Sequence, residues 1–421
     1  NVEEATRFSM LFYILYSRDS YMKIIVDKFG GTSVQDEEAR KKAMAHVAHA
    51  VSEGYKVAVV VSAIGRNGAP YATDSLLNLV GGEKTALNGR ELDMLVSVGE
   101  VISTAVFTQM LKQNGYKATA LTGPDAGFRT NNDYQNAKVI DVQTDKIMAA
   151  FEEVDIVVVA GFQGLSKEGH VTTLGRGGSD TSAALLGAAL GAERCDIFTD
   201  VSGMMTGDPR LVKKARFLKE VSYEEVANMA HEGAKVIHPR AVEVAQQAHL
   251  PLRIRSTWDG VNELGTLISN RNLSISHYRT VTGVAHQVGL TQFSIATSDV
   301  TADEVFNLLA ANKLSVDFIN INPDKIVFNL NREESRLAQK LLEAQKIEAQ
   351  VVPDCAKVSI VGAGIMGTPG VTAKIVAALS KQKIQILQTT DSYTTIWVLV
   401  HGKDLVAAVN ALHDTFLVKE A

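Results

Sequence analysis

Two glycine-rich segments of the chain carry the side chains whose spacing has the clearest chemical meaning. The first, KFGGTS at residues 28–33, follows a short β-branched run and precedes a helix expected to begin near Asp36. Glycines let backbone N–H groups approach phosphate oxygens, a helix N-terminus favours negative charge, and a lysine adds a positive point charge. These features predict a phosphate site at Lys28, Gly30 and Gly31. The loop lacks the Walker A spacing, and a tight turn with a solvated lysine is the alternative.

The second segment, TTLGRGGSDTSA at residues 172–183, leads into the alanine-rich stretch Ala183–Leu190, which is typical of a helix. Its exposed amides and an N-cap hydroxyl predict an anion site, and Arg176 can bind a carboxylate through two parallel hydrogen bonds. A carboxylate such as Asp180 is unfavourable beside a phosphate unless it orients a lysine or an ammonium group, or binds Mg²⁺ through water. A glycine-rich helix start is common by itself, but two of them in one sheet favour a ligand site.

A third segment, TDVSGMMTGDPR at residues 199–210, is a polar loop directly after an apolar run. Its position suits the base and ribose of a nucleotide, although such a loop alone could be an ordinary surface turn. His231 and His238 invite a metal hypothesis, but they lie about two helical turns apart, too far to chelate one ion unaided. We therefore expect packing histidines and no metal held by the protein alone.

The elements that must position these segments follow from the apolar pattern. Between Lys23 and about Ser256, short β-branched runs alternate with longer amphipathic stretches, which indicates a parallel sheet covered by helices. The predicted strands are Lys23–Asp27, Lys56–Val61, Lys117–Leu121, Ile156–Ala160, Cys195–Thr199 and Leu252–Arg255. Ligands of such sheets lie beyond the carboxyl ends of the strands, where the first and third segments stand.

After Ser256 the pattern changes to shorter units that read as two βαββαβ modules. The second module lacks a closing strand, so we expect the earlier run Val281–His286 to complete it, with the first module inserted within the second. The tail also contains GAGIMG at residues 362–367, which matches the dinucleotide fingerprint. Residues 381–383 are Lys-Gln-Lys where an acidic residue is expected, and too little chain remains for a dinucleotide-binding domain, so we reject that reading.

The composition limits the class of protein. A chain of 421 residues, 46% hydrophobic and 21% charged, is typical of a soluble protein with two or three domains. Its net charge of −5 argues against a nucleic-acid or membrane partner, and two cysteines, Cys195 and Cys355, fit a reducing cytoplasm. Residues 1–21 contain a short apolar run, but Glu3 and Glu4 precede it and no small-residue cleavage site follows. We expect an N-terminal extension outside the fold and not a signal peptide.

Six motifs in matching order give the chain a specific resemblance. They are KFGGTS at 28–33, SVGE at 97–100, GFQG at 161–164, TTLGRGGSDTSA at 172–183, TDVSGMMTGDPR at 199–210 and GAKVIHPRAVE at 233–243. From Lys23 to the C-terminus the chain resembles the monofunctional aspartokinases, and its tail resembles their paired ACT domains. The tail motifs VGAGIMG and DSYTTIW are most similar to the diaminopimelate-sensitive form of bacilli.

The resemblance implies a fold, an activity and a domain order. The fold is an amino-acid-kinase-like, parallel-rich sheet sandwiched by helices, followed by two βαββαβ (ACT-like) modules. The activity is transfer of the γ-phosphoryl group of ATP, with Mg²⁺, to the β-carboxylate of L-aspartate, which gives 4-phospho-L-aspartate. The kinase domain would span residues 22–270, a strand at 280–290 would complete the second module, and the two modules would span 291–353 and 354–421.

The resemblance also implies roles for single residues. Lys28 and Asp180 would be catalytic. ATP would be bound by Lys28, Phe29, Gly30, Gly31, Thr199, Asp200, Asp208, Arg210 and Lys235. Aspartate would be bound by Ser62, Thr73, Glu100, Arg176, Gly177, Gly178 and Ser179, with Glu100 on the α-ammonium group and Arg176 on the α-carboxylate. Met205 stands where many aspartokinases have a tyrosine, a departure that affects the contact with the nucleotide.

Two other functions compete with this reading. Kinases of acetylglutamate, glutamate or carbamate share the sheet and the glycine loops, but the ACT pair and the block from Arg176 to Asp180 favour aspartate. A non-catalytic amino-acid sensor could keep only the ACT modules. A sensor would not need a phosphate-binding site. The chain nevertheless keeps Lys28, Glu100, Arg176 and Asp180, which argues against a sensor.

The modules imply regulation and assembly. ACT modules pair side by side, so we expect a homodimer that binds an amino-acid effector. The first module has TSDVTA at 297–302 and NINP at 320–323, where lysine- and threonine-controlled relatives often show Asp-x-Pro-Gly and Gln-Asn. These differences favour meso-diaminopimelate over lysine or threonine. The second module keeps TPGVT at 368–372, a helix start that could receive a carboxylate or serve dimer contacts.

Overall fold

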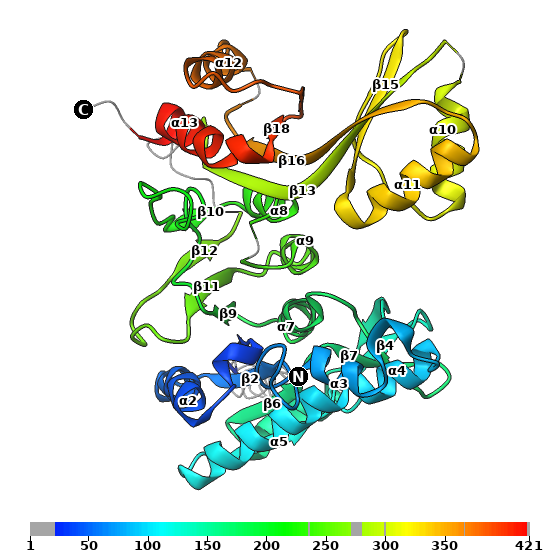
Figure 1. Ribbon diagram of the computed structural model, residues 1–421. Helices are drawn as coiled ribbons and strands as arrows, with labels where there is room; N and C mark the ends of the chain where they lie inside the picture. Colours follow the sequence, from blue (N-terminus) through cyan, green and yellow to red (C-terminus); the bar gives the residue numbers. More distant parts are fainter. Residues whose placement is uncertain (1–21, 235, 271–279, 299, 366, 419–421) are drawn as a thin grey trace, which may run out of the picture. The chain divides into compact units, whose positions relative to one another are not determined.

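The computed structural model describes residues 22–418 apart from residues 235, 271–279, 299 and 366 (Figure 1). The extension expected at residues 1–21 lies outside the described residues. The chain divides into two units, which we describe one at a time. The first unit comprises Asn1–Met204, Lys219–Tyr223 and Val236–Asn270, and the second comprises Met205–Leu218, Glu224–Lys235 and Arg271–Ala421.

The first unit is built on an eight-stranded sheet with the strand order β10-β12-β11-β9-β1-β2-β6-β3. Its strands are β1 (Ile24–Phe29), β2 (Lys56–Val61), β3 (Ala118–Leu121), β6 (Ile156–Ala160), β9 (Cys195–Thr199), β10 (Glu220–Val221), β11 (Leu252–Ser256) and β12 (Thr266–Ile268). Neighbouring strands are parallel except β11 and β12, so the predicted parallel-rich sheet is confirmed. The predicted end of the first strand at Asp27 is wrong, because β1 continues through Lys28 to Phe29.

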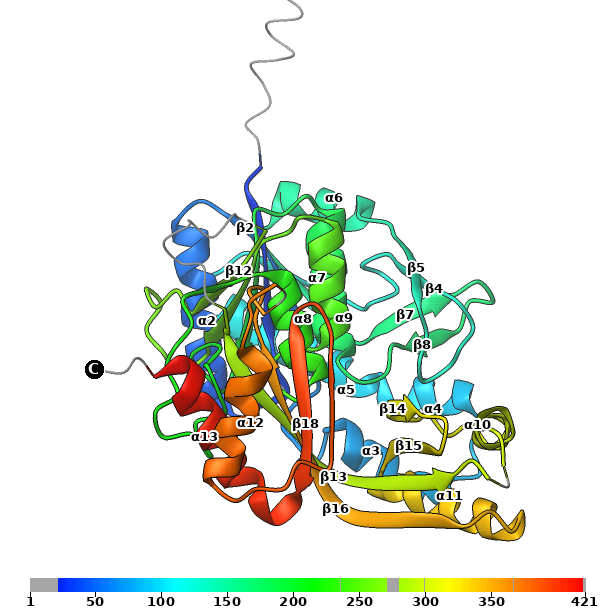
Figure 2. The same ribbon diagram turned by 90° about the horizontal axis from the view of Figure 1, so that it is seen from above.

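Helices cover both faces of this sheet (Figure 2). On one face, α2 (Glu37–Ser52) and α5 (Val98–Gln113) pack against strand residues that include Ile25 and Phe29. On the other face, α7 (Gly178–Ala189) packs its Gly187 against Val26, and α9 (Pro239–Gln247) lies beside α7. Side chains alternate along a strand, so Lys28 faces α7, whereas its neighbour Asp27 faces α2.

Local sequence explains where these helices begin. Asp36 caps α2 by accepting a hydrogen bond from the backbone N–H of Ala39 at 2.8 Å, as the predicted helix start near Asp36 requires. Proline at the first position of α9 has no N–H to leave unsatisfied, and the ring of His238 caps this helix by accepting from Arg240 N at 3.4 Å.

A smaller four-stranded sheet, with the order β5-β4-β7-β8, completes the first unit. It consists of β4 (Phe128–Thr130), β5 (Val139–Val142), β7 (Gln163–Ser166) and β8 (Val171–Thr173), and the remaining helices are α3 (Thr73–Leu79), α4 (Gly89–Val96) and α6 (Asp145–Glu153). The stretch Gly89–Gln113, which contains α4 and α5, is long and apolar enough to cross a membrane. Half of its most apolar window is buried within the protein, which is typical of a core helix.

The second unit contains a six-stranded antiparallel sheet with the order β14-β15-β13-β16-β18-β17. Its strands are β13 (Gly283–Ala296), β14 (Asp317–Ile321), β15 (Lys325–Asn331), β16 (Ala349–Val361), β17 (Gln388–Asp391) and β18 (Thr395–His401). Its helices are α8 (Tyr223–His231, of which Tyr223 belongs to the first unit), α10 (Ala302–Ala311), α11 (Arg332–Ala344), α12 (Val371–Lys381) and α13 (Leu405–Leu417). The long strands β13 and β16 run through both halves of this sheet (Figure 1).

The sheet register shows how the two halves interlock. Residues 283–287 of β13 pair with residues 357–361 of β16, and the later part of β13 pairs with β15. One continuous strand therefore serves both halves, where the sequence pattern predicted separate short strands. Both neighbours of β16 are antiparallel, so the glycines after Val361 do not belong to a βαβ unit.

Candidate active site

An ion pair joins the two glycine-rich segments. Lys28 Nζ lies 2.7 Å from Asp180 Oδ1, and the two side chains are only 11% and 14% exposed. Asp180 stands in the first turn of α7, and its other oxygen, Oδ2, accepts the backbone N–H of His238 at 3.3 Å. The carboxylate thus fixes a lysine ammonium group near a helix N-terminus, an arrangement that suits an anionic ligand.

The loop after β1 is bonded to the loop after β2. Ser62 N donates to Phe29 O at 3.1 Å, and Gly65 N donates to Gly31 O at 3.0 Å. A Cβ atom added at Gly31 would lie 2.3 Å from Gly65 O, and one added at Gly30 would lie 3.5 Å from Lys28 Nζ. Gly31 is therefore required by close backbone packing, whereas Gly30 keeps the space next to the lysine open.

The start of α7 depends on two further glycines. Gly177, the N-cap, has a φ of 68°, and a Cβ atom there would lie 2.1 Å from the ring of His238. A Cβ atom at Gly178 would lie 2.7 Å from the ring of Phe162. Ser179 is buried in the same turn, while Arg176 just before it is exposed and has no hydrogen-bond or ion-pair partner among the described residues. Its guanidinium is free to take a ligand carboxylate.

Glu100 is a buried carboxyl group with one oxygen to spare. It lies in the first turn of α5 and is 3% exposed. Its Oε1 accepts the backbone N–H of Ala63 at 3.0 Å, while Oε2 is buried with no hydrogen-bond partner in the part of the chain described. Burial raises the pKa of Glu100 to about 8. An ammonium group placed against Oε2 would satisfy that oxygen and favour its ionised form.

Asp93 holds the segment that leads to Arg176, a role that no sequence motif indicated. From α4 it accepts hydrogen bonds from Thr173 N at 2.8 Å, Thr173 Oγ1 at 2.6 Å and Gln135 N at 3.0 Å. The group is fully buried, and this burial raises its pKa. Its partners are about 40 and 80 positions away in sequence, so no local motif could reveal it.

The other predicted site residues are dispersed. Thr73 is the first residue of α3, and Thr199 Oγ1 donates to Asp200 at 3.1 Å just after β9. Asp200 also pairs with Arg66 at 2.9 Å, a contact that sequence reasoning missed. In the second unit, Asp208 and Arg210 pair with each other at 2.7 Å. Lys235 lies outside the described residues, so the nucleotide role of these three residues stays a prediction.

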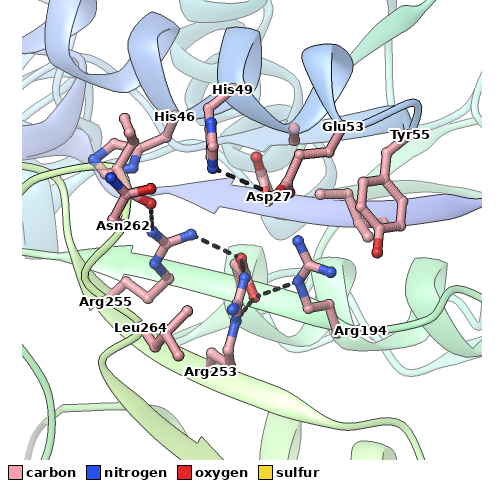
Figure 3. Close-up of a pocket in the computed structure, with 14 residues that line it drawn as sticks. Asp27, His46, His49, Glu53, Tyr55, Arg194, Arg253, Arg255, Asn262 and Leu264 are labelled. Atoms are coloured by element: carbon pink, nitrogen blue, oxygen red, sulfur yellow. Dashed lines mark hydrogen bonds and ion pairs between the residues drawn. The ribbon is translucent and has the colours of Figure 1, made fainter.

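A second charged cluster lines a cavity of about 270 Å³ on the α2 face of the sheet (Figure 3). Asp27, Asp196 and Arg253 lie in register across β1, β9 and β11. Arg253 donates from Nε (2.7 Å) and Nη2 to Asp196, and Arg255 donates to the same carboxylate at 3.1 Å. Asp27 Oδ1 is buried without a hydrogen-bond partner among the described residues, and its burial beside Asp196 raises its pKa to about 7. Lys28 faces away from this cavity, so we read the cluster as structural.

Comparisons with known proteins identify the families that the chain resembles. The model of the amino acid kinase family matches residues 23–256, and that of the ACT domain matches residues 350–414. The chain is 54% identical to aspartokinase 1 of Bacillus subtilis (strain 168) over 402 residues, which cover 94% of this chain and 99% of that protein.

Two solved aspartokinase structures are similar to this chain over almost its whole length. The chain is similar to E. coli aspartokinase III in complex with aspartate and ADP (R-state), with a TM-score of 0.77, 26% identity and coverage of 94% of this chain and 100% of the other. It is also similar to that enzyme in complex with lysine and aspartate (T-state), with a TM-score of 0.74, 27% identity and coverage of 94% and 99%.

Proposed function

The chain belongs to the aspartokinase family, and on that premise we propose that the Lys28–Asp180 pair is the centre where it transfers the γ-phosphoryl group of ATP to the β-carboxylate of L-aspartate. The observation that carries this proposal is the 2.7 Å ion pair at the start of α7. The family membership favours aspartate over acetylglutamate, glutamate or carbamate as the acceptor. An intact phosphate loop favours an enzyme over a non-catalytic sensor.

Phosphoryl transfer to a carboxylate requires little covalent chemistry from the protein. The attacking β-carboxylate is already ionised at neutral pH, so no general base is needed. Catalysis then consists of in-line positioning and neutralisation of the charge on the transferred group. Lys28 supplies that positive charge, and Asp180 holds the ammonium group in place before the substrates arrive.

Aspartate itself would be held at both ends of its α-carbon. Arg176, exposed and without a partner among the described side chains, would take the α-carboxylate through two parallel hydrogen bonds. Glu100 Oε2 would accept from the α-ammonium group. Ser62, Thr73 and the amides of residues 177–179 would complete this half of the site.

The nucleotide would occupy the opposite half of the site. Phe29, Gly30 and Gly31 would place their amides on its phosphates, and Thr199 and Asp200 would contact the ribose and base, together with Asp208, Arg210 and Lys235. In the described part of the chain no three His, Cys, Asp or Glu side chains form a metal cage, and Asp180 is occupied by Lys28. Mg²⁺ would arrive with ATP, and Asp180 would contact it through water. Mg²⁺ would neutralise phosphate charge.

We assign residues 22–270 to the kinase domain, 291–353 and 354–421 to the ACT modules, and 280–290 to the strand that completes the second module. The product, 4-phospho-L-aspartate, would serve lysine, threonine, methionine and diaminopimelate biosynthesis in the cytoplasm. Regulation would act through a homodimer of ACT modules. The E. coli relative binds lysine in its T-state. The sequence differences at 297–302 and 320–323 lead us to propose meso-diaminopimelate for this chain.

An ADP-release assay with aspartate, N-acetylglutamate and glutamate as acceptors tests the proposal. We expect turnover with aspartate, and a loss of about 10²–10³ in kcat or more in Lys28→Ala, because a preorganised charge is removed. Lys41→Ala, which removes an exposed lysine of α2, is the matched control and should leave kcat unchanged. Activity close to wild type in Lys28→Ala, with the fold intact by circular dichroism, would refute the assignment of the phosphate loop.

A further inference from the structure

The cavity of about 270 Å³ on the α2 face of the first unit's sheet has the size of a small-molecule site. Such sites usually enclose about 300–1,000 Å³, so this one suits a ligand as small as a free amino acid. Its lining residues all belong to the first unit, and exposed ones such as Glu53, Asn262 and Leu264 open it to solvent. Lys28 faces the opposite side of the sheet, so the cavity is separate from the candidate active site.

Structural ion pairs account for part of the charged lining. Arg253 and Arg255 both donate to Asp196, at 2.7 Å and 3.1 Å. Arg255 also donates to the backbone oxygens of Val261 and Glu263, at 2.8 Å and 3.1 Å. These two guanidinium groups therefore have their partners within the sheet and the loop before β12.

Three other polar groups that line the cavity lack such partners (Figure 3). Asp27 Oδ1, His46 Nδ1 and Arg194 Nε are buried and have no hydrogen-bond partner among the described residues. Asp27 and His46 are only 1% and 4% exposed. Arg194 comes within 3.5 Å of Asp196, and its guanidinium lies over the ring of Tyr55. Because buried polar groups in native proteins are usually hydrogen-bonded, these three indicate a place for a ligand.

The unpartnered atoms comprise two acceptors and one donor. His46 Nε2 lies 3.3 Å from the backbone oxygen of Thr257, which can only accept, so Nε2 carries the hydrogen. Burial lowers the pKa of His46 to about 4, so the ring is neutral at pH 7 and Nδ1 is an acceptor. Asp27 offers the second acceptor, whereas Arg194 offers a positively charged N–H donor. A ligand that satisfies all three must bring both a donor and an anionic group.

The mixed charge of the lining disfavours a simple ion. An anion would face the carboxyl groups of Asp27 and Asp196, and a cation would face three arginines. An α-amino acid carries an ammonium group and a carboxylate on one carbon, so it can bind Asp27 and Arg194 at once. Asp27 is in β1 and Arg194 directly precedes β9, the neighbouring strand about 4.8 Å away, so one small molecule can reach both.

We propose that this cavity binds a free α-amino acid, whose ammonium group donates to Asp27 and His46 Nδ1 and whose carboxylate accepts from Arg194. An ammonium group next to Asp27 favours the ionised form of this carboxyl group. The proposal does not depend on phosphoryl transfer, because none of these residues belongs to the candidate active site.

Binding measurements on cavity variants test the proposal. Wild type, Asp27→Asn and Arg194→Met are screened by thermal shift with each of the twenty common L-amino acids, and the Kd of each amino acid that raises the Tm is measured by calorimetry. Asp133→Asn and Arg90→Met are the matched controls, because they change an exposed carboxylate and a partly exposed arginine of the same unit. Arg176→Met identifies amino acids that bind at the candidate active site. Acetate and inorganic phosphate serve as anions without an ammonium group.

We expect at least one amino acid whose Kd rises at least about tenfold in Asp27→Asn and in Arg194→Met, because each variant removes a charge-assisted hydrogen bond. Its Kd should stay within about twofold of wild type in Arg176→Met and in both controls. Asp27→Asn keeps the shape of the side chain and decides the question if Arg194→Met does not fold. The proposal is overturned if no amino acid binds in a way that depends on Asp27. It is also overturned if acetate or phosphate binds as tightly as the amino acid and depends on Arg194 alone, since the cavity would then be a plain anion site.

Discussion

The charged side chains of the candidate site differ in whether they already have a partner of opposite charge within the protein. Lys28 and Asp180 neutralise each other at 2.7 Å in the free protein. Arg176 is exposed without a partner among the described residues, and Glu100 is buried with one unpartnered oxygen. We infer that the pair is preorganised, that a bound carboxylate would complete the partners of Arg176, and that a bound ammonium group would complete those of Glu100.

Arg176→Lys tests the assignment of the carboxylate partner. A lysine keeps the charge but loses the planar fork, so we expect the KM for aspartate to rise at least about tenfold with little change in the KM for ATP. Initial-rate kinetics with each substrate varied in turn measure both constants. Arg336→Lys, an exposed arginine of α11, serves as the control. An altered KM for ATP with an unchanged KM for aspartate would place Arg176 at the wrong substrate.

Glu100 predicts a pH dependence of aspartate capture. Its pKa in the folded protein is about 8, so the group is mostly protonated at neutral pH and ionises as the pH rises. Only the ionised form can pair with an ammonium group. We therefore expect kcat/KM for aspartate to increase by up to about tenfold per pH unit below pH 8 and then to level off. Glu100→Gln should be much less active and should lack this rise. A wild-type profile that falls between pH 6 and pH 8 would contradict the assignment.

At the scale of elements, burial explains which parts of the fold were predictable. Strands of a parallel sheet are buried on both faces, so they appear as continuous apolar runs such as Lys56–Val61, which the structure reproduces as β2. The end of β1 was missed because Lys28 is polar, although it pairs with Val60 of β2 and Ile197 of β9. The apolar pattern is thus interrupted at Lys28, the residue that the end of β1 carries into the candidate site.

Asp93 was unpredictable for a different reason. All the hydrogen bonds that Asp93 accepts come from residues outside its own helix, and each donor is an N–H or O–H group. In Asp93→Asn, the amide N–H₂ would face these donors and could not accept their hydrogen bonds. We expect a loss of about 2–3 kcal/mol in the free energy of unfolding and a lower kcat, because the strand before Arg176 is released. Urea denaturation measures the first quantity. Asp133→Asn, an exposed site, should change stability by less than about 0.5 kcal/mol, and a similar small effect at Asp93 would refute its structural role.

At the scale of the whole molecule, the order of the catalytic and regulatory parts followed from the motif order, but the shared strands did not. The sequence placed separate runs at 281–286 and 292–296, because Val288 and Gly289 between them break the apolar alternation. The structure carries β13 across this break with a shift in register between Gln287 and Leu290. Such an irregularity has no reliable local signature, since it depends on the partner strand β16.

The charged row across β1, β9 and β11 contributes to the pH dependence of the stability of the first unit. Asp27 has its pKa raised from 3.8 to about 7 by burial and by Asp196, so the folded state binds a proton that the unfolded chain has already lost. The ionised Asp27 carboxylate destabilises the folded state relative to the unfolded chain. This destabilisation is absent below about pH 4, grows as the pH rises, and is complete above about pH 7. Asp196 behaves in the opposite way, because its arginine partners lower its pKa, so its contribution is constant between pH 5 and pH 8.

We therefore expect Asp27→Asn to be more stable than wild type at pH 8 by roughly 1–3 kcal/mol, since one pKa unit corresponds to about 1.4 kcal/mol, and the difference to shrink towards pH 5. The neutral amide keeps the shape of the side chain and removes the like charge facing Asp196. Asp196→Asn is the control and should be less stable at every pH in this range, because it leaves Arg253 and Arg255 without their carboxylate. Urea denaturation at pH 5, 6, 7 and 8 measures both variants. A stability difference for Asp27→Asn that does not change with pH would show that Asp27 is already ionised in the folded protein, and that the arginines of the cluster balance both carboxylates.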